Sequence, residues 1–343
     1  MKTTSKKRML FKKVIITGGG GYVGSALAPL LIERGYDVTV MDLFLYGKKV
    51  FDHLKHSSRL HLIQGDIRDT QLLRTHFRHK DAIIHLACIS NDPSFDLNPE
   101  LGKSINFGAF PGIMGAIGES SIGRFIYASS SSVYGIRNEQ KVVETTPCMP
   151  LTDYSKYKLL CERTLQNEEL RNCDYIIVRP ATVCGYAPRL RLDLTVNLLT
   201  INALALNQMT VFGGEQLRPH ICIQDMVDVY CLLLEADASK IKSQVFNAGY
   251  ENRSVLSTAS LIKKHLEQQN RNTIKLEIQQ ANDHRSYHID SGKINKILGF
   301  EPRHTLKDAV DSLRKAYQDR VIQNPLENSH YYNIKRMKEI NLQ

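Results

Sequence analysis

The chain lacks long hydrophobic runs. No stretch of about 18 apolar residues occurs among its 343 residues, so we expect no membrane-spanning helix. The N-terminal stretch MKTTSKKRMLFKKVIITGG is basic, but it has no apolar run long enough for a signal peptide, and we expect none there. Internal repeats and low-complexity segments are also missing. Because hydrophobic residues make up 42% of the chain and charged residues 23%, we expect a globular protein.

Cysteine is scarce and scattered. The seven cysteines form no CxxC pair and no Cys/His spacing suited to zinc, so we predict no metal site. Reduced thiols and a cytoplasmic location fit this usage. The net charge of +10 raises a nucleic-acid hypothesis, but much of it lies in terminal KKR, KK and IKRMK segments, where basic residues are usually only solvated. We therefore expect neither a nucleic-acid nor a membrane partner.

Strand-like and helical patterns alternate through the first half of the chain. Near-continuous apolar strands separated by helices predict a parallel sheet that is covered on both faces. This is a doubly wound α/β Rossmann sheet. The predicted strands are 12–18, 37–42, 60–66, 81–87, 124–130 and 174–180, and the predicted helices are 22–34, 69–79, 98–120 and 153–171.

The rhythm of the pattern changes after Pro180. From there we predict a smaller, partly interleaved C-terminal lobe over the carboxyl edge of the sheet. Its region contains predicted helices at 194–206, 225–237, 256–269, 291–299 and 305–322 and predicted strands at 211–214, 245–250 and 274–280. The expected division assigns 1–180 and 213–247 to the Rossmann domain, 181–212 and 248–323 to the smaller lobe, and 324–343 to a polar, ill-ordered tail.

TGGGGYVG, residues 17–24, directly follows the first predicted strand and opens the first helix. Gly18 permits a tight turn, Gly21 lets a pyrophosphate approach the backbone, and Gly24 lets helix and strand pack closely. The free amides at the helix N-terminus then bind phosphate. With a strand before it and a helix after it, the motif predicts a dinucleotide site.

Acidic residues end the next two strands. Asp42 stands where ribose recognition expects a carboxylate, and a carboxylate there repels a 2′-phosphate, so we predict NAD rather than NADP. Lys48 and Lys49 are the residues that could reverse this preference. Asp66 ends the third strand, where it can contact the adenine edge or serve as the N-cap of the following helix.

DYSKYK, residues 153–158, contains two tyrosines and two lysines. Because residues four apart share a helix face, Tyr154 lies over Lys158, whereas Tyr157 has Cys161 at its fourth position. A tyrosine with its ordinary pKa of about 10 needs a shift of about three units to act as a base near neutral pH. A nearby ammonium typically supplies one to three of these units. We therefore predict that Lys158 supplies most of the shift and that the positive charge of an oxidised nicotinamide ring supplies the rest.

The serine-rich stretch ASSSSVYG (128–135) ends the fifth strand, at the rim where doubly wound sheets bind ligands. A hydroxyl there can hydrogen-bond the same substrate oxygen as Tyr154. The arrangement suits removal of a proton from an alcohol while a hydride leaves to NAD⁺.

Six motifs together resemble the extended short-chain dehydrogenase/reductase family, most closely its nucleotide-sugar epimerases and dehydratases. They are TGGGGYVG, Asp42, HLA (85–87), SSSSVYG, YSKYK and RPATVCG (179–185). The resemblance covers about residues 12–320. It implies an enzyme that binds NAD and a nucleotide-diphosphate sugar, oxidises a sugar carbon, usually C4, and later returns the hydride. It also implies a homodimer through the 98–120 and 153–171 helices.

The resemblance also assigns roles to individual residues. It implies that Ser130, Tyr154 and Lys158 are catalytic, although four adjacent serines leave a shift of one position open. The implied cofactor-binding residues are Gly18, Gly21, Tyr22, Val23, Gly24, Asp42, Asp66, Ile67, Leu86, Ala87, Asn106, Tyr154 and Lys158. The implied substrate-binding residues are Ser90, Ser130, Thr182, Asn197, Arg218 and Arg285, with Arg189 and Arg191 as further candidates.

The residues after Ser130 bear on the reaction. The 4,6-dehydratases carry Asp-Glu there, whereas this chain has Ser131 and Ser132, and a hydroxyl is a poor substitute for a carboxyl in water elimination. Because the Glu of the decarboxylases and the Cys of the 3,5-epimerases are also missing at Ser132, we predict a 4-epimerase. The alternatives are an NDP-ketosugar reductase, a 4,6-dehydratase, a reductase of a small ketone, or a non-catalytic relative that senses cofactor or binds RNA.

Overall fold

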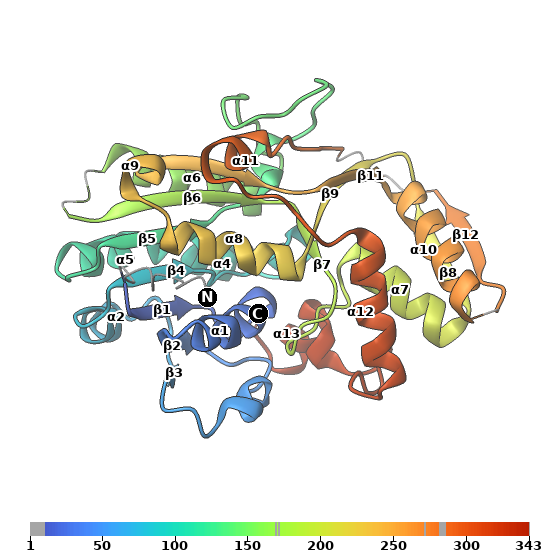
Figure 1. Ribbon diagram of the computed structural model, residues 1–343, viewed down its shortest axis with the longest axis horizontal. Coiled ribbons are helices and arrows are strands. Elements are labelled where there is room, and N and C mark those ends of the chain that lie inside the picture. Colours follow the sequence, from blue (N-terminus) through green and yellow to red (C-terminus); the bar gives the residue numbers. More distant parts are fainter. Residues whose placement is uncertain (1–10, 169, 171, 271, 281–285, 343) are drawn as a thin grey trace, which may run out of the picture.

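The centre of the molecule is a seven-stranded parallel sheet (Figure 1). The computed structural model describes residues 11–168, 170, 172–270, 272–280 and 286–342. The strand order is β10-β6-β5-β4-β1-β2-β3, so the chain winds outward from β1 in both directions and the predicted doubly wound fold is confirmed. The strands are β1 (Lys13–Thr17), β2 (Asp37–Asp42), β3 (Leu60–Gln64), β4 (Ala82–His85), β5 (Arg124–Ala128), β6 (Asp174–Pro180) and β10 (Gln244–Ala248).

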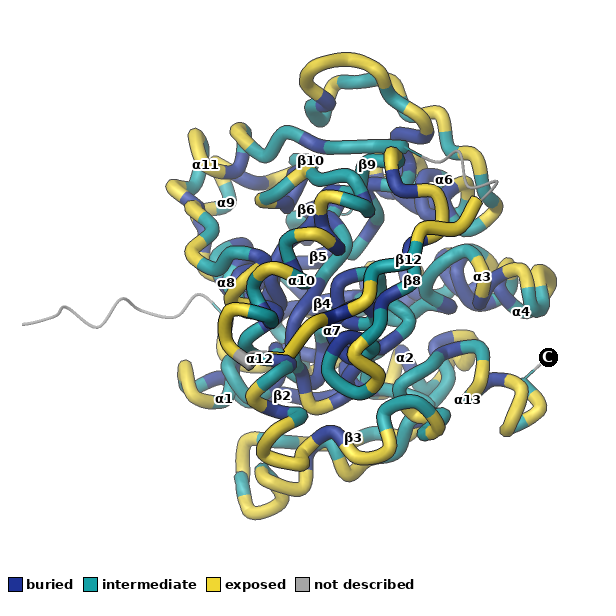
Figure 2. Tube along the Cα trace, turned by 90° about the vertical axis from the view of Figure 1, so that its right-hand side faces the viewer, coloured by how far each residue is buried: buried dark blue, intermediate teal, exposed yellow. Residues whose placement is uncertain are grey.

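Each face of this sheet has its own apolar cluster, because successive side chains of a strand point to opposite faces. On β1, Val14 and Ile16 belong to one cluster and Ile15 to the other. Figure 2 shows β4 and β5 largely as buried. One face is covered by α1 (Tyr22–Glu33) and α8 (Ile223–Glu235), and the other by α2 (Thr70–Phe77), α5 (Phe110–Gly118) and α6 (Asp153–Asn167). In the described part of the chain, no helix has the length and apolar character needed to cross a membrane.

The predicted helix 98–120 is interrupted in the structure. A π-helical turn, Ser104–Gly108, separates α4 (Pro99–Lys103) from α5. Such turns often occur at functional sites, and this one carries Asn106. The Asn106 amide accepts a hydrogen bond from the backbone N–H of Ile89 (2.8 Å) and donates one to the carbonyl of Ile89 (3.0 Å), which holds the loop after β4 in place.

The smaller lobe contains a third apolar cluster and two small sheets. We did not predict the three-stranded sheet, whose strands are short, and β9 also contains Pro219, which is unusual inside a strand. The helices of this part are α7 (Thr195–Leu206), α10 (Val255–Asn270), α11 (Gly292–Leu298) and α12 (Leu306–Gln318). The two sheets are β7 (Thr182–Cys184), β9 (Leu217–Cys222) and β11 (Glu251–Ser254), and β8 (Gln208–Phe212) with β12 (Lys275–Gln279). The remaining short helices are α3 (Asp92–Phe95), α9 (Ala238–Ile241) and the 3-10 turns Lys49–Leu54, Ser131–Tyr134 and Ser329–Tyr331.

The expected ill-ordered tail is wrong for the described residues 324–342. They form a 3-10 turn and helix α13 (Asn333–Glu339), and in Figure 1 this red segment runs back from α12 toward the large sheet. Two side chains of α13, Asn333 and Met337, are buried, and Met337 joins the same apolar cluster as α5 and α6. Leu326, Tyr331, Tyr332 and Leu342 also pack against the apolar clusters, but they are only partly buried. The tail was therefore hard to recognise as ordered from its polar composition.

A buried ion pair ties α6 to the carboxyl end of the sheet. The Arg179 guanidinium of β6 donates to both carboxylate oxygens of Glu162, with a shortest distance of 2.6 Å, and the two side chains are only 5% and 1% exposed. Arg179 also donates to the hydroxyl of Tyr134 (2.9 Å), and the Ser129 hydroxyl donates to Glu162. The pair therefore joins helix α6 and strand β6 to the serine-rich segment that follows β5.

Removing one partner of this pair leaves the other charge buried without compensation. We expect Glu162→Ala to lower the free energy of unfolding by about 3–5 kcal/mol. Equilibrium urea unfolding measures the loss. Lys156→Ala is the matched control, because Lys156 pairs with Asp153 on the same helix with half-exposed side chains, and exposed pairs contribute about 1 kcal/mol or less. Equal losses in the two variants would contradict a structural role for the buried pair.

Candidate active site

A cavity of about 360 Å³ opens at the carboxyl ends of the parallel strands. Most of the residues predicted from the sequence line it, although they come from widely separated parts of the chain. These are Gly18, Gly21, Tyr22, Val23, Gly24, Asp42, Asp66, Ile67, Leu86, Ala87, Ser90, Ser130, Tyr154, Lys158 and Thr182. Asn106, Asn197 and Arg218 are not part of the lining, and Arg285 lies outside the described residues.

The glycine-rich loop has the geometry that a close phosphate approach requires. Gly18 has a φ of +73°, and a Cβ on it would lie 2.4 Å from the backbone N of Ala87. A Cβ on Gly24 would lie 2.4 Å from Gly19, so only glycine allows the turn to pack on the helix. No side chain among the described residues caps the N-terminus of α1, and its amides are available to an anion. These residues fit a dinucleotide.

The carboxylate of Asp42 lies directly beside this loop. It accepts hydrogen bonds from the backbone N–H groups of Gly20 (2.9 Å) and Phe44 (2.6 Å). Burial raises the pKa of Asp42, while these two bonds and the nearby Arg189 cation lower it. Neither Lys48 nor the following Lys49 lines the cavity, and the Lys48 ammonium lies over the ring of Phe44, 5.2 Å from its centroid.

The structure distinguishes between the two roles that we considered for Asp66. The N-cap of α2 is Asp69, whose side chain accepts from the N–H of Leu72 (3.0 Å), so the N-cap alternative for Asp66 is wrong. Asp66 lines the cavity and pairs with Arg68 at 2.6 Å. The hydrogen bond from Arg68 lowers the pKa of Asp66.

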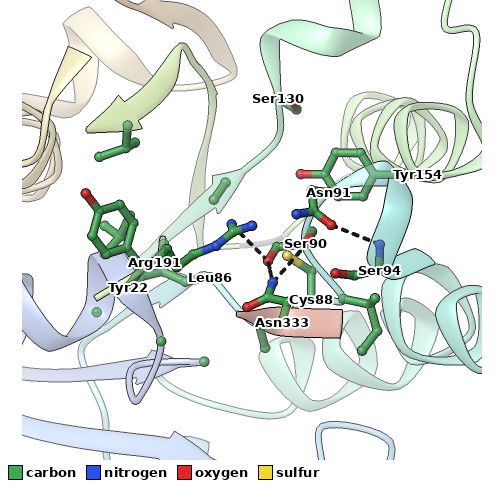
Figure 3. Close-up of a pocket in the computed structure, with 18 of the residues that line it drawn as sticks. Tyr22, Leu86, Cys88, Ser90, Asn91, Ser94, Ser130, Tyr154, Arg191 and Asn333 are labelled. Atoms are coloured by element: carbon green, nitrogen blue, oxygen red, sulfur yellow. Dashed lines mark hydrogen bonds between the residues drawn. The ribbon is translucent and has the colours of Figure 1, made fainter. Parts of the chain in front are cut away.

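The two tyrosines of DYSKYK point to different places. Tyr157 packs between the rings of Phe95 and Phe107, with centroid distances of 5.7 and 5.8 Å. Tyr154 lines the cavity instead, and Figure 3 shows its phenol oxygen turned into the cavity on the side where Ser130 lies. Lys158 also lines the cavity, one helical turn beyond Tyr154.

The electrostatics of Tyr154 differ from the sequence prediction. Burial raises the pKa of Tyr154 well above its ordinary value, Cys88 and Asp92 raise it further, and Arg191 and the Ser130 hydroxyl lower it. We predicted a pKa lowered by Lys158. However, the ammonium lies 6.0 Å from the centroid of the Tyr154 ring and donates a hydrogen bond to the last carbonyl of β5 (2.7 Å). Desolvation of the phenol therefore outweighs the effect of this cation.

A chain of hydroxyl groups holds Ser130. Its Oγ accepts from the N–H of Ser132 (3.1 Å) and lies 2.8 Å from the Ser132 hydroxyl. Ser155 donates to Ser132 (2.9 Å), Thr152 lies 2.8 Å from Ser155, and Thr152 donates to the carboxylate of Asp92 (2.6 Å). The chain runs from the end of β5 across the start of α6 to α3, so three separate elements fix the position of one hydroxyl.

Residues outside the main predicted set also line the cavity. Arg189 and Arg191 were only further candidates, and the lining residues of the tail were not predicted. Arg191 pairs with Asp193 (2.9 Å) and donates to the Ser90 hydroxyl (3.2 Å), as Figure 3 shows for the contact with Ser90. Arg189 is 3% exposed and stacks on the ring of Tyr46 at 3.7 Å. Asn333, Met337 and Leu342, from the tail, line the cavity too, and no motif marks them.

Two predicted residues, Asn197 and Arg218, do not line the cavity themselves but contact residues that do. Asn197 is fully buried; its amide accepts from the N–H of Gly185 (2.8 Å) and donates to the carbonyl of Arg191 (2.8 Å) and the hydroxyl of Tyr22 (3.1 Å). Arg218 lies over the ring of Tyr287, a lining residue, at 5.3 Å. Among the described residues, no group of acidic, histidine or cysteine side chains could hold a metal ion.

Comparisons with known proteins agree with this geometry. The sequence is 27% identical over 329 residues to UDP-glucose 4-epimerase of Lactobacillus helveticus, covering 87% of this chain and 94% of that protein. It is 28% identical over 323 residues to UDP-glucuronic acid decarboxylase 1 of Arabidopsis thaliana, covering 90% and 71%. Both relatives are named for reactions of nucleotide sugars.

Solved structures share the fold. The dTDP-glucose 4,6-dehydratase DesIV of Streptomyces venezuelae, crystallised with NAD, has a TM-score of 0.81 at 21% identity, covering 92% of this chain and all of that one. The UDP-glucuronic acid 4-epimerase of Bacillus cereus, crystallised with UDP-glucuronic acid and NAD, has a TM-score of 0.78 at 24% identity, covering 90% and 99%.

The model of the NAD dependent epimerase/dehydratase family matches residues 14–249, from the first strand of the sheet to the end of the last. That range includes the glycine-rich loop, the serine-rich loop and the Tyr154–Lys158 helix. The chain therefore belongs to the NAD dependent epimerase/dehydratase family, whose cofactor is NAD and whose enzymes act on nucleotide sugars.

Proposed function

We propose that the protein is an NAD-dependent nucleotide-sugar epimerase that acts at C4 through a transient 4-keto sugar. The observation that carries this proposal is one cavity that brings Ser130, Tyr154 and Lys158 together with the dinucleotide loop. Hydroxyl groups, Ser131 and Ser132, stand where a 4,6-dehydratase has its acid pair. The site thus has the groups for reversible oxidation of an alcohol and lacks that acid pair.

In this proposal, Tyr154, Ser130 and Lys158 each have a different role in the reaction. Tyr154 takes the proton of the C4 hydroxyl and later returns it, while Ser130 hydrogen-bonds the same oxygen. Lys158 holds a positive charge one helical turn away from the phenol. When bound, NAD⁺ would supply a reversible acceptor for the C4 hydride and the positive charge of its oxidised ring. The loop around Gly18 and the Asp42 carboxylate are the groups that would hold the dinucleotide.

The nucleotide sugar is proposed to lie on the side of the second lobe. Arg191, which lines the cavity, and Arg218, which packs over the lining residue Tyr287, are our candidates for contact with its diphosphate, since guanidinium groups bind phosphate with two parallel hydrogen bonds. Ser90 and Thr182 line the cavity where the sugar would lie. This proposal includes the division into a Rossmann domain and a substrate lobe, and a homodimer through α5 and α6, which light scattering tests.

One observation favours a second candidate reaction. Asp92 supplies a carboxylate to the same cavity, from α3 rather than from the residues after Ser130. A carboxyl there could serve an elimination, so a 4,6-dehydratase remains the alternative, beside an NDP-ketosugar reductase. A non-catalytic, RNA-binding relative belongs to a different class. Calorimetric titration separates it, because tight RNA binding without binding of any nucleotide sugar would overturn an enzymatic function.

The reaction is identified by incubating the NAD-loaded protein with a panel of nucleotide sugars and recording product spectra by NMR. UDP-glucose and UDP-glucuronic acid come first, because the relatives are named for them. We expect a mixture of C4 epimers with no net consumption of NAD, since the hydride returns to the sugar. Accumulation of a 4-keto-6-deoxy sugar would instead identify a dehydratase and would direct attention to Asp92.

Tyr154→Phe tests the assignment of the base. The variant removes only the phenol oxygen, so we expect NADH binding to persist while turnover falls at least about 100-fold, the lower range for loss of a general base. Tyr157→Phe is the matched control on the same helix, because its ring packs between two phenylalanines. A Tyr154→Phe variant with more than a tenth of the wild-type rate would refute the assignment.

The pH dependence tests how the phenol is activated. Because burial raises the pKa of Tyr154 and the base works deprotonated, we expect kcat/KM to rise with increasing pH. Lys158→Met removes a cation that would lower this pKa in the loaded enzyme, so the loss at pH 7 should be about 10- to 1000-fold and should diminish as the pH rises. A loss of equal size at every pH would show that Lys158 only binds ligand.

A further inference from the structure

The C-terminal segment, residues 328–342, forms part of the cavity wall through Asn333, Met337 and Leu342. Two residues one helical turn apart on α13 attach it to the rest of the molecule. Arg336 Nε donates to the carbonyl of Leu45 (2.6 Å), in the loop after β2. Asn333 Nδ2 donates to the carbonyl (3.3 Å) and the hydroxyl (3.0 Å) of Ser90, in the loop after β4. The segment thus bridges the loops on either side of β1, the strand that leads into the glycine-rich loop.

Asn333 also holds a buried cation. Its Oδ1 accepts hydrogen bonds from Arg189 Nη2 and from the hydroxyl of Tyr46 (3.0 Å), whose ring stacks on the guanidinium. Within the described residues, Arg189 Nε and Nη1 are buried and have no hydrogen-bond partner. Burial lowers the pKa of Arg189 to about 10. Unpaired donors on a buried charge cost free energy, which an anionic ligand would recover.

The location of Arg189 indicates which anion this is. Its backbone N–H donates to the hydroxyl of Ser25 (3.0 Å), in the first turn of α1, and its charge lowers the pKa of Asp42. The guanidinium therefore lies near the uncapped N-terminus of α1 and the carboxylate at the end of β2. Helix amides and a cation converge on the region where a dinucleotide carries its phosphates.

We propose that the C-terminal segment is part of the dinucleotide site. In this proposal Asn333 is a positioning residue: it orients Arg189 so that the two unpaired N–H donors bind phosphate oxygens of the cofactor. The segment, attached at Leu45 and at Ser90, also slows release of the cofactor. The inference rests on NAD as the cofactor and does not depend on which sugar reaction the protein performs.

The test measures binding and release of NADH by the full-length protein, without any sugar. NADH fluorescence gives the affinity, and stopped-flow displacement by excess NAD⁺ gives the release rate. We expect Asn333→Ala to release NADH about tenfold faster, as for loss of one hydrogen bond to a charged group. Lys338→Ala, an exposed position on the same helix, should match the wild type. Unchanged release by Asn333→Ala would overturn the proposal.

A double-mutant cycle separates positioning from general packing. If Asn333 acts through Arg189, the double variant Asn333→Ala/Arg189→Ala should release NADH as fast as Arg189→Ala alone. Fully additive effects would contradict the positioning role. Arg336→Ala removes the second attachment, to the carbonyl of Leu45, without removing a contact to Arg189, and it should also accelerate release. It provides the same test of retention if Asn333→Ala does not fold, and wild-type release by Arg336→Ala would then overturn the proposal.

A parallel titration with UDP tests whether Arg189 binds the phosphates of the nucleotide sugar instead of those of the dinucleotide. We expect Asn333→Ala to leave UDP affinity unchanged. If the variant instead binds UDP more weakly and releases NADH at the wild-type rate, the cation serves the nucleotide sugar and the assignment to the dinucleotide is wrong. Because NADH release is measured without turnover, its outcome is independent of whether the epimerase proposal holds.

Discussion

Helix α6 carries two buried charges one turn apart, and the geometry of the site depends on how they meet the end of β5. The Lys158 ammonium is bound by the last carbonyl of β5, and the Glu162 carboxylate is bound by the hydroxyl of Ser129 and by the arginine of β6. These contacts attach α6 immediately before Ser130. A displacement of the helix would therefore move Tyr154 and Ser130 relative to each other, and it would leave both charges without partners in an apolar region.

The same burial that orders the site makes the phenol harder to ionise. Desolvation raises the pKa of Tyr154, and the carboxylate of Asp92 acts in the same direction. A cation at 6.0 Å from the ring centroid does not offset this, which is consistent with a Coulomb interaction that falls with distance. This burial favours the protonated phenol. In the proposed function, the charge of an oxidised nicotinamide ring would favour the phenolate, so binding of the cofactor would be linked to ionisation of Tyr154.

Local signals predicted the large sheet and the dinucleotide loop well, because both are encoded in contiguous residues. An apolar strand, a glycine turn with the spacing of Gly18 to Gly24 and a helix follow each other directly in the chain. The i, i+4 rule likewise separated Tyr154 from Tyr157. The rule says nothing about burial, however, and so the direction of the pKa shift at Tyr154 was wrong. The short strands β7, β9 and β11 were missed because each pairs with a partner that lies 31 to 38 positions away in the sequence.

The tail makes contacts that cannot be predicted from neighbouring residues in the sequence. Asn333 contacts residues that lie 144, 243 and 287 positions earlier in the chain, and its sequence context, YYNIKRMK, reads as a polar surface helix. The side-chain amide of Asn333 accepts hydrogen bonds from Arg189 and Tyr46 and donates one to Ser90. These partners come together only in the folded chain. For an enzyme that returns the hydride it has taken, loss of the reduced cofactor in mid-reaction would strand the oxidised sugar. In our proposal, a cavity wall that includes Asn333, Met337 and Leu342 meets that requirement without adding bulk to the strands of the large sheet.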